Sequence, residues 1–131
     1  MVFTDTEIIY LASQRLGRLA TVQPSGTLQV SPVGFSYNPA TSTIDIKGDN
    51  LARSRKFRNI ADNGRAAFVV DDLVSVQPWR VRCLEIRGVA EALATEAGPL
   101  IRLHPRRIIS FGIDEPDTGA HYLTTNNRDI D

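Results

Sequence analysis

Four cationic side chains fall within six consecutive positions of a chain whose formal net charge is zero, namely Arg53, Arg55, Lys56 and Arg58. Asn50 and Ser54 are both suitable helix N-caps, and the first turn of a helix offers unpaired backbone N–H groups and the positive end of its dipole. With arginine as a bidentate fork and lysine as a point charge, this segment could hold a phosphate group. A solvated basic helix face that binds nothing specific is the alternative interpretation.

Other chemistry-bearing residues are few, and each has a structural alternative. Trp79 could cover a planar ligand or anchor a dimer interface. His104 could donate a proton, but its place before Pro105 favours a structural turn. Cys83 lies in an apolar segment, and we expect it to be an inert buried thiol. We assign no side chain as a catalytic acid or base, so the demanding chemistry would fall to a bound coenzyme.

Motifs and counts exclude several kinds of site. Two histidines and one cysteine rule out a multi-histidine or structural zinc site, and no metal is expected. The chain has neither a Gly-x-Gly-x-x-Gly fingerprint nor a phosphate-binding loop ending in Gly-Lys. The charge balance argues against a nucleic-acid partner. The longest apolar run, residues 66–70, is too short to span a membrane. With no basic start and apolar block at the N-terminus, a cytoplasmic location is expected.

The length and composition predict one domain. The chain has 131 residues, of which 42% are hydrophobic and 23% charged, typical of a globular protein. We expect residues 1–131 to form a single domain with a core over about 5–113. Residues 114–131 are expected to be a loose polar tail.

Hydrophobic periodicity predicts the elements that must position these residues. Helices are expected over 5–14 and 50–63, with a third helical segment over 94–103. A loop is expected over 71–78. Strands are expected over 18–23, 28–37, 43–47, 66–70, 79–93 and 107–112, the second bent at Pro32 and Gly34. Six or so antiparallel strands with two or three helices predict a mainly β barrel with helical additions.

The residues Ser54-Arg55-Lys56, followed by Asn59-Ile60, Asn63 and Arg65, resemble a motif of the pyridoxamine 5'-phosphate oxidase-like superfamily. Three further segments are similar in order and spacing: residues 11–33, 85–91 and 105–112. The resemblance covers about residues 5–113. Within the superfamily the chain looks most like the branch that uses the deazaflavin coenzyme F420, on the residues Asp71-Asp72-Leu73, Pro78-Trp79 and His104-Pro105-Arg106-Arg107.

The resemblance implies a split β-barrel homodimer with two coenzyme sites at the subunit interface. It implies an oxidoreductase that transfers a hydride between reduced F420 and a small organic acceptor. An FMN-binding oxidoreductase of the same fold is the first alternative, and a non-catalytic carrier of flavin or deazaflavin is the second.

The resemblance also implies site residues. Arg55 and Lys56 stand where the oxidases hold the flavin phosphate, with Arg53 and Ser54 beside them. Ser31, Pro32 and Val33 fall on the strand that lies along the ring in relatives. Phe111 replaces a tryptophan beside the ring, Trp79 could cover it, and Cys83 falls near a flavin-binding glutamine. The last departures argue against pyridoxal formation. F420 carries a phosphodiester and a polyglutamate tail, so Arg53 and Arg58 could extend the cationic track that it needs.

Overall fold

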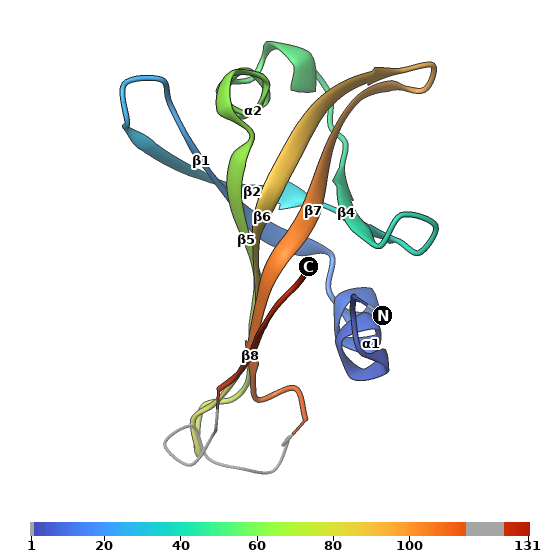
Figure 1. Ribbon diagram of the computed structural model, residues 1–131. Helices are drawn as coiled ribbons and strands as arrows, with labels where there is room; N and C mark the ends of the chain where they lie inside the picture. The colour runs from blue at the N-terminus through green and yellow to red at the C-terminus, as the bar shows by residue number, and fades with distance from the viewer. Residues whose placement is uncertain (1, 115–124) are drawn as a thin grey trace.

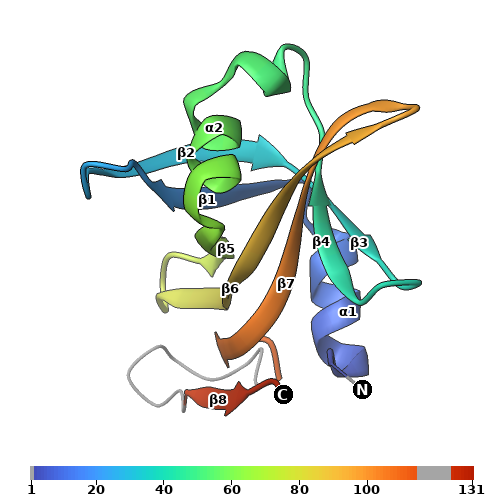
Figure 2. The ribbon, with the colours of Figure 1, turned by 45° about the horizontal axis from the view of Figure 1, so that its top comes forward.

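One continuous antiparallel sheet forms the body of the protein. The structure, a computed structural model, describes residues 2–114 and 125–131. Its strands are β1 (Leu16–Val22), β2 (Leu28–Gly34), β3 (Ser36–Asn38), β4 (Thr43–Ile46), β5 (Arg65–Ser75), β6 (Arg80–Thr95), β7 (Gly98–Phe111) and β8 (Asn126–Asp129). They follow the order β2-β1-β5-β6-β7-β4-β3, and β8 pairs with β7. The sheet curls as Figures 1 and 2 show, with α1 (Asp5–Ser13) and α2 (Arg55–Asn63) at different ends.

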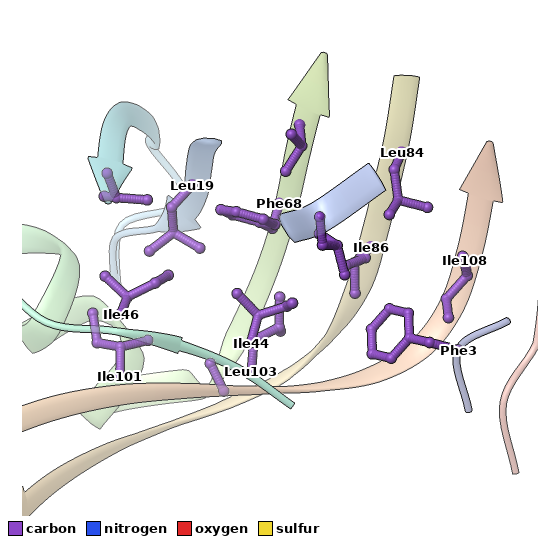
Figure 3. Close-up of a cluster of buried hydrophobic side chains, with 14 of the residues drawn as sticks. Phe3, Leu19, Ile44, Ile46, Phe68, Leu84, Ile86, Ile101, Leu103 and Ile108 are labelled. Atoms are coloured by element: carbon purple, nitrogen blue, oxygen red, sulfur yellow. The ribbon is translucent and has the colours of Figure 1, made fainter. Parts of the chain in front are cut away.

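The core fills the concave side of this sheet. Strand residues alternate between the two faces, and the inward ones are almost fully buried, such as Leu19 at 1% and Phe68 at 1% exposure. Figure 3 shows side chains from β1, β4, β5, β6 and β7 meeting there with Phe3. The expected mainly β architecture with helical additions is confirmed, with eight strands in the described part of the chain. No helix there is long and apolar enough to cross a membrane.

The prediction of a helix over residues 94–103 is wrong. Residues up to Thr95 belong to β6 and those from Gly98 to β7, and the two strands form a long hairpin. Gly98 makes the turn with φ +116°, a conformation that suits glycine. Alternation then sends Ile101 and Leu103 inward with no exposed surface, where burial outweighs the helix propensity of the nearby alanines.

Three other predicted boundaries change. The helix expected over 50–63 is split by extended Ser54 into a 3₁₀ turn (Leu51–Arg53) and α2. The loop expected over 71–78 is shorter, because β5 continues to Ser75 against β6. The bent strand expected over 28–37 ends at Gly34. Its two parts, β2 and β3, then pair with different strands, β1 and β4.

The polar C-terminal tail is not loose where the structure describes it. Residues 126–129 form β8, and the guanidinium of Arg128 donates hydrogen bonds to both carboxylate oxygens of Glu7, at 2.8 and 2.6 Å. Glu7 is only 3% exposed and also accepts from the Thr4 amide in a capping box at the start of α1. A buried carboxylate needs a cationic partner, so this ion pair holds a polar segment in the sheet.

Candidate functional site

The predicted phosphate site lies at the start of α2. Ser54 is the N-cap, and its hydroxyl accepts from the Phe57 amide at 3.3 Å and donates to the Leu51 carbonyl at 2.6 Å. Because Ser54 already caps the Phe57 amide, only the amides of Arg55 and Lys56 in the first turn are left without partners inside the helix. Neither Arg55 nor Lys56 makes a side-chain hydrogen bond or ion pair with any described residue. Arg55 is exposed and Lys56 is half-buried, and neither charge has a counterion among the described residues.

The flanking cations have different surroundings. Arg58 donates to the carbonyl of Arg53 at 2.8 Å, so it ties the 3₁₀ turn to α2. Of the two cations predicted to extend the site for a longer anion, Arg58 is therefore bonded to a backbone carbonyl, and Arg53 is exposed.

A buried amide connects α2 to the first hairpin of the sheet. Asn59 has no exposed surface, and its Nδ2 donates to the Thr21 hydroxyl at 3.0 Å and to Gln29 Oε1 at 3.3 Å. Its Oδ1 has no partner among the described residues. This residue fixes the helix against β1 and β2, so it sets where the basic first turn lies relative to those strands.

The predicted ring strand is an edge of the sheet. Pro32 on β2 points outward and is exposed, whereas Val33 is buried at 6% exposure. Ser31 points inward two residues from Gln29, and its hydroxyl is buried without a partner in the described part of the chain. Buried polar atoms are nearly always paired, and the Ser31 hydroxyl and the Asn59 amide oxygen have no partner among the described residues.

The two aromatic candidates lie at the other end of the barrel. Trp79 is 55% exposed in the turn between β5 and β6, and Phe111 ends β7 opposite Cys83. In Figure 1 this end of the sheet carries β8, far from α2. Residues 53–56 lie next to the helix that Asn59 links to β1 and β2, and the chain does not bring Trp79 or Phe111 to them. Burial raises the pKa of Cys83 to about 11, in keeping with an inert thiol.

Sequence reasoning missed a polar cluster under α1. The Tyr10 hydroxyl donates to Asp72 at 2.8 Å, and Arg82 holds the same carboxylate with two hydrogen bonds at 2.9 and 2.6 Å. Hydrogen bonds from Arg82 lower the pKa of Asp72, and burial together with that carboxylate raises the pKa of Tyr10. All three partners are used internally, so the cluster fastens α1 to the sheet.

His104 has a comparable internal partner. Its Nε2 lies 2.6 Å from Glu91 across the β6–β7 pair. The turn predicted at His104 is wrong, because His104 and Pro105 both lie within β7. Among the candidate side chains in the described part of the chain, Arg55 and Lys56 have no partner and could hold an anion. The unpaired cations and the two unpartnered buried atoms fit a coenzyme with an anionic group and a polar middle section. They supply no assigned acid or base.

Comparisons with known proteins give the family. A curated protein from Streptomyces rimosus, named 5a,11a-dehydrotetracycline/5a,11a-dehydrooxytetracycline reductase, is 46% identical over 130 residues, covering 92% of each chain. A conserved hypothetical protein from Mycobacterium tuberculosis has the same fold, with a TM-score of 0.72, 18% identity, and 88% and 89% of the two chains covered. An FAD-binding protein from Mycobacterium smegmatis matches with a TM-score of 0.59 at 23% identity, over 82% and 93%.

These likenesses confirm the expected split β-barrel fold. The family model described as pyridoxamine 5'-phosphate oxidase matches residues 7–112, which hold the basic helix, both strands beside it and the whole β5–β7 region. The chain therefore belongs to the pyridoxamine 5'-phosphate oxidase family.

Proposed function

We propose that this protein is an oxidoreductase that uses coenzyme F420 to reduce a conjugated small-molecule acceptor. The reductase name of the 46% identical relative supports the reaction class. The reduced deazaflavin would supply the hydride, and the protein would hold the coenzyme and align the acceptor with it.

The observation that carries the proposal is the uncompensated charge at the start of α2. Arg55 and Lys56 have no partner among the described residues, and the first-turn amides lie beside them. An anionic group placed there gains charge-assisted hydrogen bonds without breaking any that the protein already makes. Arg53 extends the charge in the direction away from α2, which suits a coenzyme with a phosphodiester and a charged tail.

The coenzyme site is proposed to lie between two copies of the chain. The outward face of the first hairpin carries large apolar side chains with high exposure: Leu28 at 80%, Val30 at 67% and Leu16 at 50%. Apolar patches of this kind mark interaction surfaces. A homodimer built on this face would cover them. Its second copy would also supply what a single chain lacks, since Trp79 and Phe111 are remote from the chain's own α2.

FMN is the second candidate coenzyme. It is favoured by the family itself and by the FAD-binding protein among the similar structures. It ends in a single phosphate, for which Arg55 and Lys56 suffice without Arg53.

Titration separates these proposals. The apoprotein is titrated with F420 and with FMN, followed by fluorescence, and compared with the double variant Arg55→Ala/Lys56→Ala. We expect F420 to bind more tightly, and the variant to lose about 10- to 100-fold in affinity, the scale of one or two charge-assisted hydrogen bonds. The matched control is Arg15→Ala/Arg106→Ala, which removes two exposed cations elsewhere.

Turnover then separates an enzyme from a carrier. Reduced F420 is mixed with the protein and a panel of enone and quinone acceptors, and its oxidation is followed by absorbance. Binding of F420 with no oxidation by any acceptor would favour a carrier. Tight FMN binding without F420 binding would reverse the coenzyme assignment, and equal affinity in the basic-helix variant would place the anion elsewhere.

A further inference from the structure

A groove crosses the outward face of the sheet at the end opposite β3 and β4. It has a volume of about 510 Å³, within the range of small-molecule sites. Small residues make its floor: Ala20 on β1 pairs with Ala67 on β5, and Gly88 on β6 pairs with Ala66, one residue along β5. Because these positions lack bulk, the sheet is hollowed there, while Val22 and Leu28 form an apolar wall.

Two arginines border this groove. Ala67 pairs with Arg87, and Arg65 lies two residues earlier on the same face, so the two guanidinium groups are diagonal neighbours across β5 and β6. Arg87 is paired with Glu85 at 2.6 Å, and the nearby Arg18 is paired with Asp71 at 2.6 Å. The guanidinium of Arg65 makes no hydrogen bond or ion pair with the described residues, which leaves the groove with excess positive charge.

We propose that this groove binds the acceptor and that the acceptor is a flat, fused-ring molecule carrying an acidic enol or phenol. The inference deepens the proposed function and rests on it. A floor of alanine and glycine suits a flat ring system. A free guanidinium offers a planar fork to an enolate or phenolate oxygen and can also stack on a ring.

The chemistry of the 46% identical relative agrees with this assignment. The compounds in its name belong to the tetracycline class, whose fused rings carry acidic enols. The groove lies on the same outward face as exposed Leu28 and Val30. A second copy of the chain bound to this face would cover the groove and exclude water from it. The competing occupant is a side chain of that second copy.

The binding test needs no coenzyme. Tetracycline and anthraquinone-2-carboxylate are titrated into the apoprotein, followed by fluorescence, with Arg65→Gln, Ala67→Leu and the control Arg15→Gln. We expect saturable binding to the unaltered protein, about tenfold weaker in Arg65→Gln and in Ala67→Leu, and unchanged in the control. Raising the salt should weaken binding to the unaltered protein more than to Arg65→Gln. Thermal melts confirm that each variant is folded.

The same samples are measured for F420 affinity and for mass in solution. Weaker probe binding by Arg65→Gln and Ala67→Leu, with F420 affinity unchanged in both variants, supports the proposal. If the unaltered protein binds the probes but not F420, the proposed coenzyme is wrong and the groove site still holds. No saturable binding of either probe, or equal binding by Arg65→Gln, overturns it. If the Ala67→Leu variant is monomeric and the Arg65→Gln variant keeps its affinity for the probes, the groove is occupied by the second copy of the chain. That result also overturns the proposal.

Discussion

Replacing Arg128 by methionine should destabilise the protein far more than its place near the C-terminus indicates. The guanidinium makes two hydrogen bonds to Glu7 and a third to the Val2 carbonyl at 2.6 Å. The Glu7 side chain is only 4% exposed, so the variant leaves a buried carboxylate without its cation. Removing one partner of a buried pair costs about 3–5 kcal/mol.

The expected cost is smaller than that range, for two reasons. The Arg128 side chain is 35% exposed, and Glu7 keeps its hydrogen bond from the Thr4 amide. We therefore expect a loss of about 2–3 kcal/mol, or roughly 10 °C in Tm for a domain of this size.

Urea unfolding followed by circular dichroism measures this change. Arg106→Met, at an exposed arginine in the same region, is the matched control, with an expected change within about 0.5 kcal/mol. The double variant Glu7→Gln/Arg128→Met should be more stable than Arg128→Met alone, because no unpaired charge remains buried. An Arg128→Met variant as stable as the control would refute the idea that this ion pair holds β8 in the sheet.

Local sequence patterns predicted several elements correctly. The strand expected over 43–47 from its alternating residue types is found as Thr43–Ile46, although all four residues are buried, and Ser54, one of two candidate N-caps, caps α2. Residues 94–103 are predicted as a helix from the spacing of Ala94, Ala97, Leu100 and Ile101, but a short apolar run fits either period. Pairing with β4 and β6 settles the choice, and such pairing depends on residues far away in the sequence.

The same distinction between local patterns and long-range contacts applies to the candidate site. The basic cluster could be predicted because its residues are neighbours in sequence. The contacts of Asn59 with Thr21 and Gln29 span 38 and 30 positions, so no local pattern reveals them. The groove beside Arg65 exists because Ala20 and Ala67 fall opposite one another, which is a matter of strand register. The basic residues of the proposed anion site are neighbours in the sequence, whereas the surfaces around them are assembled by the fold.

Two further predictions test the packing and the charges of the sheet. Gly88→Ala would place a Cβ atom 2.0 Å from the backbone oxygen of His104, so we expect a loss of at least about 2 kcal/mol in urea unfolding, against little change for Gly48→Ala in open space. Asp72 has a pKa lowered below its ordinary 3.8, chiefly by hydrogen bonds from Arg82. A carboxylate of this kind contributes stability that is present above the ordinary pKa and is lost as the pH falls through the lowered value. The stability difference between the unaltered protein and Asp72→Asn should therefore be about 2 kcal/mol at pH 7 and shrink steadily below pH 4, and a difference that stays constant down to pH 2 would show that the charge of Asp72 contributes nothing.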